Sequence, residues 1–415
     1  MEISKQKFIS MLTRMAQHGT APDEGCSIFG VGYEHAYERL KKEYLEEQFS
    51  MGISSEKFIV GPFGSGKTHF LRHLMEIARD IDCVTSEVQL NKALNFTDTL
   101  QVYGEVIQEI KTPESSGHGI RALLHSSVEK VKKIAGNIEQ EIILHAWISG
   151  IDEVEFKLDI FKKVIKKALI AILEKDEPII EMTCQWLNGD INNKDMAKEL
   201  RIPQIEKKHN NLYAKKMMLS LFQFIKHVGF QGTVVCFDEA DIGLNVDKKK
   251  SEKILEMLRA DIDAITDLNG GAVFIVYALT PTIIEKMMNY AALQQRVSNP
   301  FGKSFMEGNT LGPLIDLSQT NQDTNLILIG EKFVELFYKF LGNEISILKE
   351  DVTAEIQNLT KIIIANNIGA GNRRDMVKVT CSMLLGILKT GNIEPLIQSD
   401  DIHSILSSAD KDAEV

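Results

Sequence analysis

The chain has 415 residues, enough for two or three packed units, and its 44% hydrophobic and 25% charged residues exclude extensive disorder. No apolar run reaches the roughly 20 residues that a membrane span needs, and the net charge of −11 gives nucleic acid no favourable field from the whole chain. The first residues lack the basic and apolar regions of a signal peptide, so we expect a cytoplasmic protein without membrane contact. Five scattered cysteines without a C-x-x-C pair argue against zinc or disulfides and predict buried thiols.

The first 110 residues predict alternating helices and strands. Apolar periodicity predicts helices at 3–17, 33–48, 68–79 and 97–110 and strands at 57–60 and 84–90. Such α/β alternation is typical of a sheet covered by helices on both faces.

A glycine-rich stretch separates the strand at 57–60 from the helix that follows. It matches the phosphate loop G-x-x-x-x-G-K-[ST] in full. Its glycines allow a tight turn in which successive N–H groups point at a polyphosphate beside a helix N-terminus. We expect Lys67 to reach the β- and γ-phosphates and the Thr68 hydroxyl to ligate Mg²⁺. A glycine turn without a ligand is the plain alternative. The predicted binding residues are Gly61, Pro62, Phe63, Gly64, Ser65, Gly66, Lys67 and Thr68.

Residues 111–230 predict helices throughout, at 119–135, 138–149, 153–174, 177–187, 193–200 and 211–228. This region carries 19 Lys and Arg against 16 Asp and Glu, a balance of +3 that leaves −14 for the rest of the chain. Paired lysines at 162–163, 166–167, 207–208 and 215–216 are typical either of a strip that binds double-stranded DNA or of solvated helix faces. The stretch 192–203 resembles the opening of a helix-turn-helix, although an ordinary capped helix explains it better.

Strand-like runs return at 232–237, 271–277 and 313–317, with a helix predicted at 250–266. The first run ends in Asp238 and Glu239, the pattern of a Walker B element. There Asp238 would hold Mg²⁺ through its water shell, while Glu239 would polarise the attacking water. A strand that merely ends in acidic residues is the alternative.

Three further sites carry polar side chains suited to ATP hydrolysis. Thr280 follows the next strand, where ATPases of the additional-strand class place a polar sensor; a threonine that caps a turn before Pro281 is the alternative. Arg296 is a candidate charge-stabilising finger, in cis or toward a neighbouring subunit. Arg373 and Arg374 open a helix after a glycine-rich turn, as lid-borne sensor arginines would. Surface or salt-bridged arginines remain the alternative at both arginine sites. The surrounding C-terminal helices are expected at 325–342, 350–366, 371–389 and 400–407.

With these residues identified, the chain resembles the ATP-binding proteins of BREX bacteriophage-exclusion systems, the BrxD-like group related in its ATPase region to BrxC and PglY. The resemblance implies an AAA+-like or origin-recognition-like ATPase in an antiviral defence locus, with ATP and Mg²⁺ as ligands. A helicase, a methyltransferase or a phosphatase-like component would be its partners. Val31, Gly32 and His69 lie in matching stretches, so the resemblance adds them to the expected nucleotide-binding residues. The matching stretches are 19–22, 29–34, 59–71, 88–90, 102–103, 186–189, 237–240 and 279–281.

The fold class we expect is α/β: a P-loop NTPase of the AAA+ or additional-strand class, with a parallel sheet, a large helical insertion and a helical C-terminal lid. The expected parts are 1–110 with the N-terminal helices and the first half of the ATPase core, 111–230 as the insertion, 231–320 as the second half of the core, and 321–415 as the lid.

Three classes of function remain open. The first is a Mg²⁺-dependent ATPase, a conformational switch or motor in phage defence that acts on or near DNA as a homo-oligomer. The second is a nucleotide-gated signalling or scaffold protein with slow turnover and no nucleic-acid contact. A small-molecule kinase is the third, and it is disfavoured because the adjacent Asp238 and Glu239 suit hydrolysis better than transfer to a bound acceptor.

Overall fold

The computed structural model describes residues 3–90, 97–136, 140–239, 248–297, 302–306, 308–318, 322–366 and 372–393. The chain divides into two compact units. The sheet unit comprises His35–Val60 and Ile77–Ile315, and the loop unit comprises Met1–Glu34, Gly61–Glu76 and Asp316–Val415. The helix expected at 400–407 lies outside the described residues.

A six-stranded sheet in the order β3-β2-β4-β5-β1-β6 forms the centre of the sheet unit. Its strands are β1 (Ser55–Val60), β2 (Cys83–Gln89), β3 (Ile110–Lys111), β4 (Gly232–Asp238), β5 (Val273–Leu279) and β6 (Leu314–Asp316). The pairs β1–β5, β5–β4 and β4–β2 are parallel, which confirms the predicted parallel sheet for these strands. The prediction was wrong at β3, which pairs antiparallel with β2. A strand of two residues has no periodicity from which it could be recognised.

Both β4 and β5 are buried along their whole length, as a parallel sheet covered on both faces requires. One face packs against α4 (Thr99–Gln108), α10 (Asn210–Val228) and α12 (Lys248–Thr266), whose apolar side chains form one core with those of the strands. On β5, Phe274 packs instead on Tyr44 of the π-helical segment η2 (Leu40–Gln48), with 5.2 Å between the ring centres.

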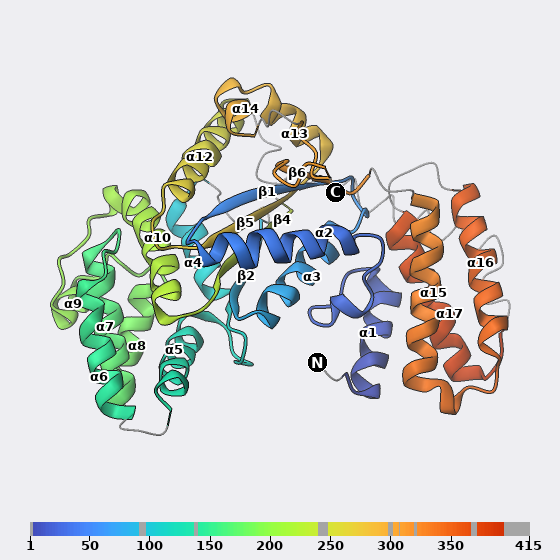
Figure 1. Cartoon of the computed structure of the whole chain (residues 1–415), viewed down its shortest axis with the longest axis horizontal. Helices are drawn as coiled ribbons and strands as arrows, with labels where there is room; N and C mark the ends of the chain where they lie inside the picture. The colour runs from blue at the N-terminus through green and yellow to red at the C-terminus, as the bar shows by residue number, and fades with distance from the viewer. Residues whose placement is uncertain are drawn as a thin grey trace. The chain divides into compact units, whose positions relative to one another are not determined.

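The residues of the predicted insertion form helices (Figure 1), and their apolar side chains share one core with Val84 of β2 and Tyr103 and Ile107 of α4. Its helices are α5 (Gly119–Ala135), α6 (Gln140–Gly150), η3 (Ile151–Glu153), α7 (Asp159–Glu174), α8 (Glu177–Leu187), α9 (Lys194–Leu200), η4 (Lys207–His209) and α10. Helix α9 is the ordinary capped helix, because the Asn193 side chain accepts hydrogen bonds from the N–H groups of Asp195 and Met196. Helix α10 then leads directly into β4 at Gly232.

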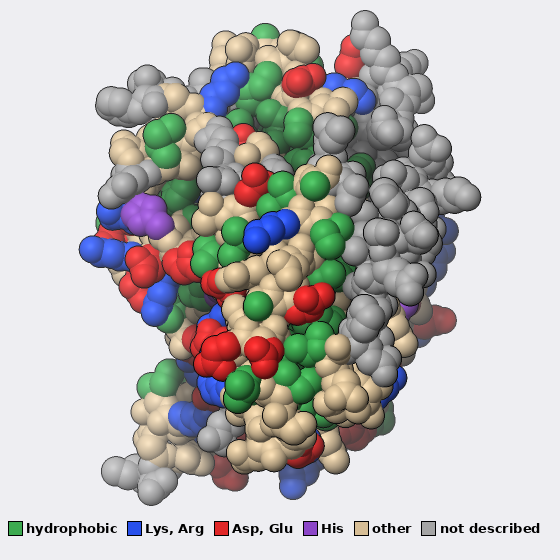
Figure 2. Space-filling view, turned by 90° about the vertical axis from the view of Figure 1, so that its right-hand side faces the viewer, with side chains coloured by type: hydrophobic (Ala, Val, Ile, Leu, Met, Phe, Trp, Pro, Cys, Tyr) green, Lys and Arg blue, Asp and Glu red, His purple; other side chains and the backbone are tan. Residues whose placement is uncertain are grey.

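In the loop unit, α1 (Lys5–His18) packs on α17 (Asn372–Thr390), and α15 (Gln322–Leu341) packs on α16 (Lys349–Asn366) (Figure 1). The short helices η1 (Cys26–Ile28) and η5 (Gly342–Glu344) and the first part of α3 (Lys67–Asp80) complete this unit. Stacked rings of Phe8 and Phe340, 4.7 Å apart, join the two ends of the chain in one core. Figure 2 shows acidic, basic and apolar side chains interspersed on the described surface, without a field of one sign in that view.

Several helices differ from their predicted bounds. The helix expected at 33–48 is divided into α2 (Glu34–Arg39) and η2, and the one expected to begin at 153 begins at Asp159, after an extended Val154. Two short helices, α13 (Pro281–Met288) and α14 (Ala291–Val297), were not predicted. All five cysteines are buried and free, which confirms the prediction of buried thiols. Across the described ranges, none of the helices has the length and apolar character needed to cross a bilayer.

A buried hydrogen bond joins α4 to the end of insertion helix α8. The Tyr103 hydroxyl donates to the Leu187 carbonyl at 2.7 Å, and the Tyr103 side chain is fully buried. We expect Tyr103→Phe to lower the free energy of unfolding by about 1–3 kcal/mol, because the carbonyl is left without its donor. Urea unfolding would show a lower midpoint with an unchanged slope. Tyr213→Phe, at a half-buried position on α10, is the control and should change the midpoint little. Equal effects of the two variants would contradict the prediction.

Candidate functional site

The phosphate loop connects β1, which ends at Val60, to α3, which begins at Lys67. Gly64 and Gly66 have φ angles of 76° and 94°, in the left-handed region that glycine adopts without strain. A Cβ atom on Gly61 would lie 2.3 Å from the Ser65 Oγ atom. The three glycines are therefore required by the backbone path of this loop.

Lysine and serine side chains of the loop are directed into it. The Lys67 side chain is buried, and its Nζ atom donates to the carbonyl oxygens of Gly61 at 2.8 Å and Pro62 at 3.1 Å. Its ammonium group also lies 5.2 Å from the ring centre of the exposed Phe63. The Ser65 Oγ atom is buried and has no hydrogen-bond partner among the described residues. A cation, an unsatisfied hydroxyl and a glycine turn before a helix N-terminus fit the phosphates of a nucleotide.

Three side chains of α3 fasten the N-terminal segment that precedes the first strand. Both carboxylate oxygens of Glu76 are used, because they accept from the N–H groups of Gly25 at 2.5 Å, Cys26 at 2.9 Å and Ser27 at 2.8 Å. Arg72 donates to the Ala21 carbonyl at 2.8 Å and to Asp23 at 3.1 Å. The His69 ring contacts the Cys26 carbonyl through Nε2 at 3.1 Å. Residues 21–27 are thus held along the helix that begins with Lys67.

Burial keeps the two histidines of α3 neutral. Desolvation, with a smaller contribution from His73, lowers the pKa of His69 to about 4, and desolvation lowers the pKa of His73 as well. A neutral His69 can donate to the Cys26 carbonyl only if Nε2 carries the proton, so this contact selects the tautomer. Of the residues expected to bind nucleotide, His69 therefore uses one ring nitrogen to hold the N-terminal segment.

Val31 and Gly32 lie at the end of this segment. Gly32 has a φ angle of 85°, and its N–H donates to the Glu34 carboxylate at 3.0 Å. A Cβ atom there would lie 2.3 Å from the Asn325 Oδ1 atom of α15. Glycine is required at this position because the backbone passes close to a side chain of the C-terminal helices.

The adjacent arginines at the start of α17 have different surroundings. Arg373 reaches the phosphate loop, with Nη1 3.4 Å from the Ser65 carbonyl oxygen, and its guanidinium group lies 4.8 Å from the ring centre of Tyr33. Arg374 donates through Nε and Nη2 to the His18 carbonyl, at 3.2 and 3.0 Å, at the end of α1. A cation there also stabilises the C-terminal end of the α1 dipole. Of the two predicted sensor arginines, the structure brings Arg373 to the loop.

Asp238 and Glu239 end strand β4 in the sheet unit. Asp238 is buried, and its carboxylate accepts the Glu239 N–H at 2.9 Å. Glu239 is exposed and has a φ angle of 54°, a conformation that costs a residue with a side chain about 1–2 kcal/mol. Backbone strain of this kind concentrates at functional sites. An acidic pair with one buried and one exposed carboxylate is thus placed at the carboxyl end of the strand.

Thr280 directly follows β5, the strand between β4 and β1. It is the N-cap residue of α13, but its side chain makes no capping hydrogen bond. Because β1, β5 and β4 are parallel, the residues that follow them emerge at the same edge of the sheet. Gly61, Thr280 and Glu239 are these residues.

The remaining predicted residues lie elsewhere in the sheet unit. Arg296 belongs to α14, and its side chain lies outside the described part of the chain. Within the insertion, several of the paired lysines bind neighbouring groups of the protein. Lys162 and Lys167 donate to the carbonyls of Asp152 and Glu199 at 3.1 and 3.0 Å, and Lys166 pairs with the Asp152 carboxylate. Further ion pairs join Lys162 to Asp159 at 3.9 Å, Lys208 to Glu206 at 2.7 Å and Lys215 to Asp261 at 3.1 Å, and these pairs of opposite charge reduce the positive field of the predicted strip.

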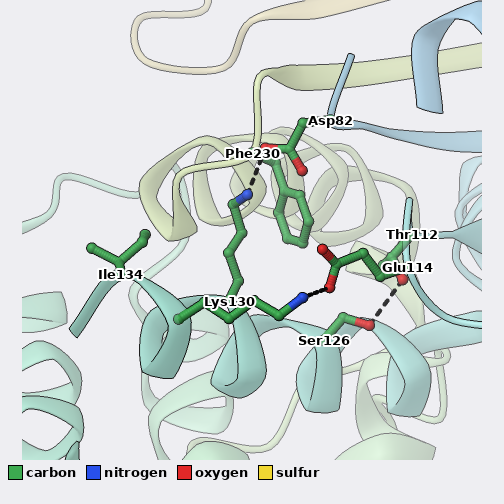
Figure 3. Close-up of a pocket in the computed structure, with 8 residues that line it drawn as sticks. Asp82, Thr112, Glu114, Ser126, Lys130, Ile134 and Phe230 are labelled. Carbon is green, nitrogen blue, oxygen red and sulfur yellow. Dashed lines mark hydrogen bonds and ion pairs between the residues drawn. The ribbon is translucent and has the colours of Figure 1, made fainter. Parts of the chain in front are cut away.

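A hollow of about 220 Å³ lies at the amino ends of β2 and β4, where the insertion meets the sheet (Figure 3). Lys130 pairs with Asp82 at 2.5 Å and lies 4.7 Å from the Phe230 ring centre, while Lys133 pairs with Glu114. The hydroxyls of Thr112 and Ser126 are 2.8 Å apart. Since its charges and hydroxyls are paired with one another, this hollow is a polar junction between insertion and sheet, at the edge opposite to Glu239 and Thr280.

Three residues of the site escaped sequence reasoning: Tyr33, Arg72 and Glu76. Tyr33 lies in a stretch that the sequence singles out only through the family resemblance. The polar stripe at 69, 72, 73 and 76 on an otherwise apolar helix was the available signal, since residues at this spacing share one face.

Similarity to known proteins places the chain in a family. No curated protein and no solved structure matches the chain significantly. The family model of the BREX system ATP-binding proteins BrxC/D matches residues 3–391, which include the phosphate loop, the Walker B residues and Arg373. The chain therefore belongs to the BrxC/D family of BREX system ATP-binding proteins.

Proposed function

We propose that this protein is a Mg²⁺-dependent ATP hydrolase that acts as a conformational switch in a bacteriophage-defence system. The observation that carries the proposal is the phosphate loop, in which Lys67, the buried Ser65 hydroxyl and three required glycines fit a polyphosphate. Membership in a family of ATP-binding proteins supports ATP as the nucleotide. The order β4-β5-β1, with β5 between the two Walker strands, supports the additional-strand class.

Each residue then has a distinct task. Lys67 and the N–H groups of the loop neutralise and orient the phosphates, while Thr68 and Asp238 would hold Mg²⁺. The metal ion would supply charge neutralisation between the phosphates. Glu239 orients and polarises the water, with Thr280 beside it as a polar sensor.

Two arginines would stabilise the developing negative charge. Arg373, whose guanidinium group lies against the loop, serves as the lid arginine. Arg296 serves as a finger, in cis or toward a neighbouring subunit of a homo-oligomer. Val31 and Gly32 line the base, because the segment before them is fastened to the helix that starts at Lys67.

Contact with double-stranded DNA through the insertion is the finer proposal, and its +3 balance supports it. A nucleotide-gated scaffold without nucleic-acid contact is the second candidate, favoured by the internal ion pairs of Lys162, Lys166 and Lys208. In either case other defence-system proteins, such as a helicase, a methyltransferase or a phosphatase-like component, would receive the conformational signal.

Lys67→Ala should abolish ATP binding while the fold survives, because the ammonium group is the main cation of the loop. Calorimetric titration with ATP and Mg²⁺ measures the affinity, and thermal unfolding without nucleotide checks the fold. Lys216→Ala, at an exposed position on α10, is the matched control and should bind like the parent. An unchanged affinity in Lys67→Ala would reject the assignment of the loop.

Glu239→Gln should separate binding from turnover. The amide keeps the shape of the side chain but lacks the charge that orients water, so ATP should still bind while hydrolysis falls. A decrease of roughly 10²-fold or more in kcat, about 3 kcal/mol in the barrier, matches removal of a general base. Phosphate release measures kcat, and Glu252→Gln, at an exposed position on α12, is the control. Full turnover in Glu239→Gln would exclude this residue as the base.

Charge reversal tests the DNA proposal. The triple variant Lys163→Glu, Lys207→Glu, Lys216→Glu changes exposed lysines of the insertion. It should weaken binding to duplex DNA and flatten the salt dependence, by about one unit of slope for each DNA phosphate that a lysine no longer neutralises. The control triple Lys42→Glu, Lys253→Glu, Lys303→Glu makes the same charge change at exposed positions outside the insertion. Fluorescence anisotropy at several salt concentrations measures both. Absent binding by the parent, or equally weakened binding in the two triples, would favour the scaffold.

A further inference from the structure

We infer that Tyr33 is a positioning residue that holds Arg373 against the phosphate loop, so that the N-terminal segment sets the geometry of the lid arginine. This inference rests on the proposed function. Tyr33, the loop and Arg373 all belong to the loop unit.

Tyr33 contacts three other residues of the loop unit: Leu317, Phe70 and Arg373. Its hydroxyl donates to the Leu317 carbonyl at 3.1 Å, at the start of the C-terminal region. Its ring meets the ring of Phe70 on α3 in an edge-to-face arrangement, with 5.6 Å between centres. The face of the ring lies 4.8 Å below the Arg373 guanidinium group. One side chain therefore links the N-terminal segment, the helix of the phosphate loop and α17.

The direct contact between Arg373 and the loop is a weak constraint by itself. Its donor–acceptor distance to the Ser65 carbonyl is 3.4 Å, longer than an ordinary N–H···O hydrogen bond. The aromatic face adds a second support for the guanidinium group, because a guanidinium group stacks on a ring with its N–H groups directed to the edges.

The segment that carries Tyr33 is itself held by contacts with α3 and α15. Residues 21–27 are fixed to α3 by Arg72 and Glu76, and Gly32 is packed against Asn325. Tyr33 follows directly, so it has little freedom to move away from Phe70. Contacts thus run without a break from α3 through Tyr33 to Arg373 at the start of α17.

A double-mutant cycle between Tyr33 and Arg373 tests the inference. Tyr33→Leu removes the aromatic face, and we expect kcat/KM for ATP to fall roughly 3- to 10-fold, the range of a partly buried cation–π contact. Tyr33→Phe keeps the face and should stay within about twofold of the parent, which serves as rescue by the conservative variant. Arg373→Ala should reduce kcat/KM at least as much as Tyr33→Leu, and the double variant should be no worse than Arg373→Ala alone.

Tyr338→Leu is the matched control. Tyr338 lies in the same unit, and its hydroxyl also donates to a backbone carbonyl, that of Ile347 at 2.9 Å. Its effect on kcat/KM should multiply with that of Arg373→Ala, because the two side chains are independent. The same cycles on the urea midpoint, without nucleotide, should show coupling for Tyr33 with Arg373 and none for Tyr338.

The outcomes separate this inference from the proposed function. Multiplicative effects of Tyr33→Leu and Arg373→Ala on turnover, or a Tyr33→Phe variant as poor as Tyr33→Leu, would overturn the positioning role. If the parent binds ATP but does not hydrolyse it, the hydrolase proposal fails, and the cycle is read on the ATP dissociation constant. If the parent does not bind ATP, the proposed function fails, and absence of coupling in the urea cycle would overturn the contact between Tyr33 and Arg373 as well.

Discussion

Parallel pairing of β1, β5 and β4 decides where the polar residues that follow these strands emerge. In the register of the sheet, Val60 lies opposite Leu279 and Phe237 lies opposite Tyr277, so the three strands end at nearly the same level. Gly61, Thr280 and Glu239 leave the sheet at this common edge. Strands that are far apart in the sequence therefore end at the same edge of the sheet, which is the general reason why parallel sheets carry sites at their carboxyl ends.

Side chains of α3 hold the N-terminal segment next to the phosphate loop. Glu76 satisfies three backbone N–H groups of a segment without regular structure, and Arg72 satisfies a carbonyl of the same segment. Gly25 and Cys26 are buried, so without Glu76 their N–H groups would lose a hydrogen-bond acceptor away from water. This segment continues to Gly32 and Tyr33, and the Tyr33 ring lies against Arg373. An N-terminal extension thus becomes part of the surroundings of the nucleotide loop.

The lysines of the insertion attract nucleic acid less strongly than their number in the sequence suggests. Its balance of +3 is real in the sequence, but several of its lysines form ion pairs with carboxylates, namely Lys162 with Asp159, Lys166 with Asp152, Lys208 with Glu206 and Lys215 with Asp261. Pairs of opposite charge at short range have little field at a distance, because screening in salt removes most of what remains beyond about 10 Å. Counting charges along a chain therefore overstates the attraction that a folded surface exerts on nucleic acid.

The sequence by itself determined the glycine-rich loop before α3, the acidic pair at the end of β4, most helices and the parallel strands, because local spacing specifies each of these. The glycine-rich turn before residues 373–374 also predicted sensor arginines there, but the sequence could not tell which of the two would contact the phosphate loop. Only the tertiary structure placed Arg373 on Ser65 and Arg374 on the end of α1, and only it joined Tyr33 to Phe70 and Arg373. Such partners lie up to 356 residues apart, and nothing in the local pattern of a single chain specifies which distant side chains will meet in the folded core.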